Sequence, residues 1–136
     1  MSTHPKQVEL EGIMRRLCDD LDHYLEDKFG SCYPIHPNRP KRGTAASVAY
    51  DGLFSTGTQF TLGYGSDQGR GYIVSVEIRT LSSVKPKDRQ AIENAAMEYL
   101  QSIIGLYFKD RTIELTKDGT VYKLVGDFSL GFASNN

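Results

Sequence analysis

The stretch Ile113–Leu124, which reads IELTKDGTVYKL, decides the fold class because it contains two alternating segments around one turn. Asp118-Gly119 is a typical two-residue connection between antiparallel strands. Counting outward from this turn pairs apolar residues on one face: Leu115 with Tyr122, and Ile113 with Leu124. The agreement between turn chemistry and hydrophobic pattern predicts a β-hairpin in this register.

Upstream segments show the same alternation of apolar and polar residues. Strands are predicted at 45–50, 59–64 and 72–79, and a short further strand at 128–132. In the third of these, one face is apolar and comprises Tyr72, Val74, Val76 and Ile78. Polar residues fill the other face, which is typical of an antiparallel sheet with one exposed side.

Two segments instead repeat their apolar residues every three or four positions, which indicates amphipathic helices. The first covers about residues 6–29 and stops at Gly30, and the second begins at Pro86 and ends near Gly105. The predicted fold is α+β, with two helices packed on one face of an antiparallel five- or six-stranded sheet in the order αβββαββ(β). A single domain is expected over 1–136, with a connector at about 32–43 and a sheet and helix body at about 44–132.

This element order resembles that of the small dimeric chaperones of type III secretion. The resemblance lies in the order of helices and strands, and it implies a small chaperone-like protein that binds other proteins.

The composition excludes several classes of protein. The net charge of −1 gives no overall field to attract nucleic acid or an anionic membrane. Two cysteines are too few for a disulfide framework, and no apolar run approaches the length that crosses a bilayer. We therefore expect a soluble cytoplasmic protein that has no secretory signal, no membrane partner and no cofactor.

The connector carries the sharpest local signal. Pro34, Pro37 and Pro40 recur every third residue, which predicts an extended left-handed segment. Its second half fits the P-x-x-P-x-basic form of ligands for aromatic-lined grooves, and the candidate partner-binding residues are Pro37, Arg39, Pro40, Lys41 and Arg42. The alternative interpretation is a stiff spacer between the first helix and the sheet.

A second hypothesis is binding of an anionic ligand, either nucleic acid or phosphate, through a local basic patch. The candidate residues are Arg70, in the glycine-rich loop 63–71, and Lys85 and Lys87, at the start of the second helix. Arg39, Lys41 and Arg42 would join them if the chain brings these residues together. The loop leads into a strand and lacks a Gly-Lys-Ser/Thr ending, so it differs from a nucleotide-binding loop.

Metal and catalytic sites are not predicted. Cys18 and His23 lie about 140° apart around one helix, so they cannot face the same tetrahedral ion. The sequence leaves open whether Cys32 and His36 line a pocket. A charged face of the first helix is interpreted as solvated, and its members are Asp19, Asp22, His23 and Glu26.

No nucleophile and base converge in the sequence, which favours a non-enzymatic protein-binding or adaptor function. Eight tyrosines, a residue type enriched at interfaces, suggest a homodimer. An exposed sheet edge would allow a copy of the chain or another protein to add a strand. Another protein, the chain itself, or both are therefore the expected partners.

Overall fold

The computed structural model of the chain describes residues 5–45, 47–63, 69–126 and 128. The elements follow in the order α1 (Pro5–Phe29), η1 (Val48–Tyr50), β1 (Phe54–Thr61), β2 (Gly71–Ile78), α2 (Pro86–Tyr107), β3 (Ile113–Asp118) and β4 (Val121–Gly126). The α+β class and both helices are confirmed. Pro5 and Pro86 each begin a helix, where the missing N–H of proline has no cost.

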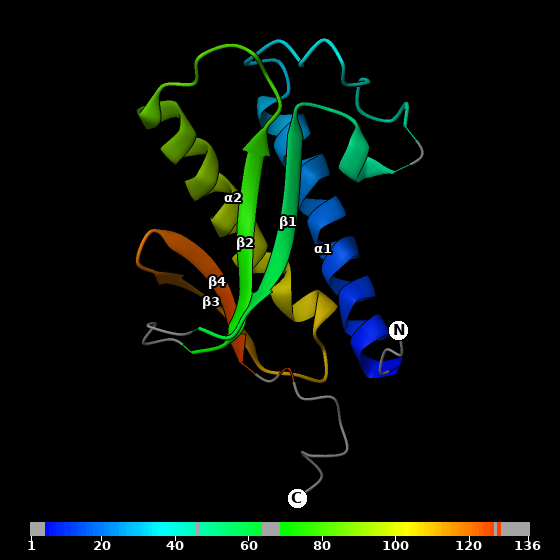
Figure 1. Cartoon of the computed structure of the whole chain (residues 1–136), viewed down its shortest axis with the longest axis vertical. Helices are drawn as coiled ribbons and strands as arrows, with labels where there is room; N and C mark the ends of the chain where they lie inside the picture. The colour runs from blue at the N-terminus through cyan, green and yellow to red at the C-terminus, as the bar shows by residue number, and fades with distance from the viewer. Residues whose placement is uncertain (1–4, 46, 64–68, 127, 129–136) are drawn as a thin grey trace, which may run out of the picture.

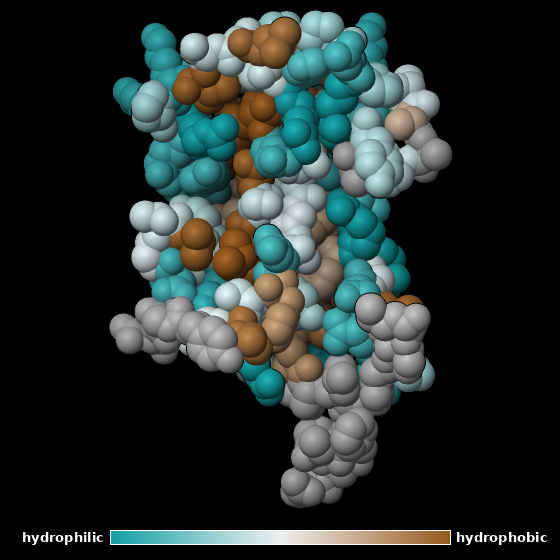
Figure 2. Space-filling model, viewed as in Figure 1, coloured by the Kyte–Doolittle hydropathy of each residue, from teal (hydrophilic) through white to brown (hydrophobic). Residues whose placement is uncertain are grey.

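Within the described residues the sheet has four strands in the order β1-β2-β4-β3, and every neighbouring pair is antiparallel. Both helices cover one face of this sheet, α1 alongside β1 and α2 behind β2 (Figure 1). No helix of the described residues covers the opposite face, and hydrophobic residues appear there in patches separated by hydrophilic and neutral ones (Figure 2). Because β1 lies at one end of the strand order, its outer edge has no neighbouring strand in the described part of the chain.

The predicted strand at 45–50 is wrong, so the prediction of five or six strands is not confirmed. The carboxylate of Asp51 accepts hydrogen bonds from the backbone N–H groups of Gly43 and Ala45, at 2.8 and 3.0 Å. Arg42 donates to the carbonyl of Val48 at 2.5 Å. These local bonds occupy backbone groups that a strand would need, and the segment forms a loop with one turn of 3-10 helix. Most of the additional strand predicted at 128–132 lies outside the described residues.

β1 begins at Phe54, earlier than the predicted segment 59–64. Its side chains on the helix-covered face are Phe54, Thr56, Thr58 and Phe60. Threonine at two of these four positions hides the apolar alternation, although Thr56 is only 2% exposed. A β-branched residue suits a strand whether it is buried or exposed, so the pairing with β2 and not the hydrophobic pattern defines this strand.

The β3–β4 hairpin exists, but its predicted register is wrong. Leu115 pairs with Leu124, and the closing pair is Asp118 with Val121, so the turn residues are Gly119 and Thr120. An Asp-Gly type I′ turn requires positive φ at both central residues, whereas here Gly119 has φ +65° and occupies the first central position. The shift moves each partner by two residues, so the side chains keep their predicted faces.

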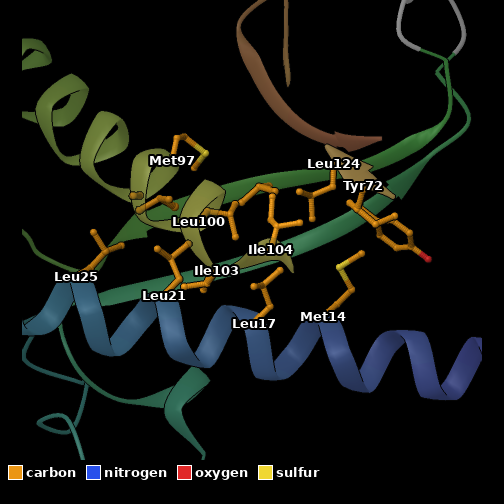
Figure 3. Close-up of a cluster of buried hydrophobic side chains, with 14 of the residues drawn as sticks. Met14, Leu17, Leu21, Leu25, Tyr72, Met97, Leu100, Ile103, Ile104 and Leu124 are labelled. Carbon is orange, nitrogen blue, oxygen red and sulfur yellow. The ribbon is translucent and has the colours of Figure 1, made fainter. Parts of the chain in front are cut away.

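The hydrophobic core lies between the two helices and the sheet (Figure 3). Leu17 and Leu21 of α1 point toward Leu100 and Ile103 of α2, and all four are buried. The predicted apolar face of β2 is confirmed, since Val74 and its same-face neighbours are largely buried. This packing holds α1 alongside β1, so that side chains of α1 lie next to the outer edge of that strand.

Candidate functional site

The candidate site lies at the outer edge of β1, where α1 runs beside the strand. Thr56 donates its backbone N–H to Asp22 Oδ1 at 2.8 Å, and its carbonyl accepts a hydrogen bond from Arg15 Nη2 at 3.4 Å. Both backbone groups of Thr56 therefore point away from β2. Because these directions alternate along an antiparallel strand, the N–H and C=O groups of Thr58 and Phe60 point to the same outer side.

The first half of this edge is covered by charged side chains. Besides Asp22, Glu26 accepts a hydrogen bond from the N–H of Leu53 at 2.9 Å, and Arg42 donates to the carbonyl of Phe54 at 2.6 Å. Ionised side chains that satisfy edge groups prevent the addition of another strand. This half of β1 is therefore closed to a partner.

The second half of the edge is open. Among the residues that the structure describes, no group bonds the outward N–H or C=O of Thr58 or Phe60. A groove of about 330 Å³ separates this half from α1, and its lining comprises Gln7, Glu11, Met14, Arg15, Cys18, Gly57, Thr58, Phe60 and Tyr72. Met14 and Tyr72 approach each other at its apolar end (Figure 3). Phe60 is 49% exposed and Leu62 is 54% exposed, so the strand also ends in accessible apolar surface.

Asp22 has the most unusual electrostatic environment near this edge. It is 0% exposed, and its Oδ2 has no hydrogen-bond partner in the described part of the chain. The nearest cation is Arg15, whose Nη2 lies 3.6 Å from Oδ2. Burial raises the pKa of Asp22 to about 7, although the hydrogen bonds from Thr56 and the charges of Arg42 and Arg15 oppose the rise.

Cys18 lies one helical turn before Asp22 and also lines the groove. Burial raises the pKa of its thiol to about 11. Because a thiolate and not a thiol is the nucleophile, this cysteine is unsuited to covalent catalysis at neutral pH.

The interpretation of Asp19, Asp22, His23 and Glu26 as one solvated face is wrong for two of its members. Asp22 is fully buried, and the Glu26 side chain, 16% exposed, bonds the backbone of Leu53. Acidic residues on a helix have the same sequence spacing whether their carboxylates accept backbone N–H groups of a strand or lie in water. Only the position of β1 beside α1 distinguishes the two cases.

The predicted partner-binding residues divide into two groups. Pro37, Pro40 and Lys41 are exposed. The guanidinium of Arg39 instead donates to the carbonyls of Gly52 and Asp51, at 2.6 and 2.9 Å. Arg42 is 11% exposed and forms ion pairs with Asp51 and Glu26, at 2.9 and 3.3 Å. Both arginines therefore attach the connector to the body of the protein, and a partner-binding role for this segment stays a prediction.

The connector itself is built from turns. Arg39 donates its backbone N–H to the carbonyl of His36, and Thr44 does the same to Lys41. A straight left-handed segment has no such internal bonds. The connector therefore folds back over the end of the sheet, where the N–H of His36 bonds the carbonyl of Arg79 at 2.8 Å.

The candidate anion-binding residues do not form one patch. Arg70 directly precedes β2, whereas Lys85 and Lys87 follow its other end at the start of α2. A strand of eight residues is about 25 Å long. Arg70 and the two lysines are thus at opposite ends of the sheet, and anion binding stays a prediction without a converged site.

Cys32 and His36 are not brought together as a catalytic pair. Cys32 is exposed and lines a pocket of about 400 Å³ with Phe29, Tyr33, Asp88, Ala91 and Ile92. His36 is not part of that lining, and its Nδ1 accepts the N–H of Asn38 at 3.0 Å. Across the described residues, no three His, Cys, Asp or Glu side chains are grouped to hold a metal ion. The same residues include no helix with the length and apolar character needed to span a bilayer.

Several tyrosines predicted at an interface between copies contribute instead to contacts within the chain. The rings of Tyr24 and Tyr99 stack at 4.0 Å between α1 and α2. Tyr99 and Tyr107 donate their hydroxyl groups to the carboxylate of Asp20, at 2.5 and 2.8 Å. The hydrogen bond to Asp20 and burial raise the pKa of Tyr99 to about 12. These contacts hold the helices together, and the homodimer stays a prediction.

The helices, the sheet and the groove define a small α+β domain with a partly open sheet edge. Residues 5–126 match a protein family described as "Uncharacterised protein", and the chain belongs to this family. A protein of Borreliella burgdorferi, described as "Uncharacterized protein", is 42% identical over 120 residues, which cover 88% of this chain and 94% of that relative. No match to a solved structure was found. The family match extends from α1 to β4, so it includes the groove and the edge beside it.

Proposed function

We propose that this chain is a non-enzymatic protein-binding domain that takes up an extended segment of a partner protein along the outer edge of β1. The observation that carries the proposal is the pair of residues Thr58 and Phe60, whose outward backbone groups are unbonded among the described residues and face a groove. Addition of a strand to such an edge supplies main-chain hydrogen bonds, and side-chain pockets supply specificity.

The geometry of β1 specifies the pattern of the bound segment. Residues directly opposite each other in an antiparallel pair have side chains on the same face. Partner residues opposite Thr58 and Phe60 would therefore direct their side chains into the groove, toward Met14 and Tyr72. The residue between them, opposite Gln59, would face solvent on the bare side of the sheet. An apolar–polar–apolar sequence suits this arrangement.

An isolated segment fits the edge better than a second copy of this chain. α1 lies beside the outer edge of β1 and would also do so in a second copy (Figure 1). Antiparallel pairing of two β1 strands would place both α1 helices on the same side of the extended sheet. Their axes would be about one strand spacing apart, 4.8 Å, whereas packed helices need 8–10 Å. An extended peptide carries no such helix.

The test uses peptides displayed on phage, selected for binding to the whole protein. Synthetic copies of the selected peptides are then titrated against the wild type and two variants. Thr58→Pro removes one outward N–H that bonds nothing among the described residues, a change that an edge strand tolerates. Thr58→Val keeps that N–H and the shape of the side chain.

We expect Thr58→Pro to weaken peptide binding about tenfold or more, because one hydrogen bond is lost and a peptide carbonyl is left unpaired. Thr58→Val should bind within about threefold of the wild type, since its backbone is unchanged. Far-ultraviolet circular dichroism should show both variants folded. Gln59→Pro should by contrast lose stability, because it removes the N–H of Gln59 that faces Ile73 of β2. Equal binding by Thr58→Pro and Thr58→Val, or no selected peptide at all, would contradict the proposal.

A further inference from the structure

Arg15 stands at the boundary between the closed and the open half of the β1 edge. Its Nη2 lies 3.4 Å from the carbonyl oxygen of Thr56 and 3.6 Å from Oδ2 of the buried Asp22. Its Nε donates to Asp19 at 2.9 Å, and the same side chain lines the groove. One guanidinium thus covers an edge carbonyl, contacts a buried carboxyl group and borders the space that a partner would fill.

The charges that face Asp22 come from two elements. From α1 these are Arg15 and the thiol of Cys18, and from the connector they are Arg42 and Arg39. β1 contributes the N–H of Thr56, which is polar but does not titrate. Arg42 is also paired with Asp51 and Glu26, and Arg39 donates to two backbone carbonyls. Arg15 is therefore the cation whose position depends most on the charge of Asp22.

We propose that protonation of Asp22 releases Arg15 from the β1 edge, so that the carbonyl of Thr56 becomes accessible beside the open groups of Thr58 and partner binding strengthens as the pH falls. This inference rests on the proposed function. With Asp22 ionised, the attraction between Oδ2 and the guanidinium holds Arg15 over the Thr56 carbonyl. With Asp22 neutral, that attraction is lost, and Arg15 turns toward the partly exposed carboxylate of Asp19, to which its Nε already donates.

The burial of Asp22 places this change in the neutral range. Its pKa is raised to about 7, whereas that of a solvated aspartate is 3.8. The protonated fraction therefore falls from about nine-tenths at pH 6 to about one-tenth at pH 8. If the extended edge is the binding-competent form, the apparent affinity should change in proportion, about tenfold.

The first experiment needs no partner. Nuclear magnetic resonance of the whole labelled protein follows the Asp22 carboxyl carbon, the Thr56 amide and the Arg15 Nε–H between pH 5 and 9. We expect all three signals to titrate together with a midpoint near 7. In Asp22→Asn the Thr56 and Arg15 signals should stay constant. An Asp22 carboxyl group that titrates without a change at Arg15, or that does not titrate in this range, would overturn the inference.

The second experiment uses a selected peptide with blocked ends and no titratable side chain. Wild-type protein should bind it about tenfold more tightly at pH 6 than at pH 8. Asp22→Asn should bind equally at both values, at the level of the wild type at pH 6. Asp27→Asn, at an exposed position of α1 away from Arg15, serves as the matched control and should keep the pH dependence, because it leaves Asp22, Arg15 and Asp19 in place.

Histidines titrate in the same range, so the comparison with Asp22→Asn separates their effect from that of Asp22. If Thr58→Pro weakens peptide binding but the binding does not vary with pH, the release of Arg15 by protonation of Asp22 is refuted and the proposed function is unaffected. Absence of such binding, together with a normal titration of Arg15, would refute the proposed function instead.

Discussion

Replacing Asp22 by asparagine should stabilise the protein at alkaline pH, although it removes an ion-pair partner. Asparagine keeps the oxygen that accepts the N–H of Thr56, but it cannot ionise. In the wild type, the pKa of Asp22 is raised from 3.8 to about 7 by burial. A carboxyl group with a raised pKa contributes its full stability below pH 4, and this contribution is lost as the pH rises through 7.

The magnitude follows from the size of the pKa change. A rise of about three units corresponds to about 4 kcal/mol, at 1.36 kcal/mol per unit. Between pH 4 and pH 8, ionisation of Asp22 should therefore lower the free energy of unfolding of the wild type by about 4 kcal/mol. At pH 4 the variant and the wild type should be nearly equal, because asparagine resembles a protonated aspartate. At pH 8 the variant should be more stable by up to this amount.

Urea denaturation followed by circular dichroism measures both proteins at pH 4, 6 and 8. Asp19→Asn is the control, because Asp19 forms a partly exposed ion pair with Arg15, and its loss should change stability by about 1 kcal/mol or less. A parallel pH dependence in the wild type and Asp22→Asn, or a less stable Asp22→Asn at pH 8, would refute the electrostatic description of this carboxyl group.

Three further substitutions test the structure. Arg42→Ala should cost about 3–5 kcal/mol in urea denaturation because it leaves buried Asp51 without its cation. The control Lys41→Ala, at an exposed position, should change stability by about 0.5 kcal/mol or less, and equal losses in the two variants would exclude the inward position of Arg42. Leu21→Ala, at a fully buried position, should cost about 2–5 kcal/mol in the same assay, and a loss under 1 kcal/mol would show that α1 does not pack as described. Gly119→Ala should lower thermal stability by about 1–2 kcal/mol because φ is +65° there, and an unchanged melting temperature would argue against the observed turn.

The elements that sequence reasoning predicted best are those with a long, regular hydrophobic period. The first helix was expected at about 6–29 and spans Pro5–Phe29, because its apolar residues keep one spacing throughout. The segment 45–50 alternates just as regularly over a shorter length, yet its described residues form no strand, and Val48–Tyr50 is a turn of 3-10 helix. The carboxylate of Asp51 takes backbone N–H groups that a strand would use, and no periodicity in the sequence reports such a bond.

The site was predicted less well than the fold. An available sheet edge was expected, but its position depends on which strand lies outermost, and that is set by the pairing of β2 with β4. Asp22 and Glu26, which help to close half of this edge, were interpreted as solvated because helical spacing does not identify their partner, and Arg42 was predicted to bind another protein. The sequence signal that could have located them is Thr56, a polar residue at an inward position of a strand.

The contacts that close the first half of the β1 edge all join residues within the segment 15–56. During synthesis this part of the chain leaves the ribosome before β2, α2 and the final hairpin exist. Carboxylates on the nascent helix can therefore shield the strand while it still lacks a sheet neighbour, the stage at which an unpaired strand is most prone to aggregate. We therefore expect the contacts that protect the edge of β1 against misassembly to form before the later strands and α2 are synthesised.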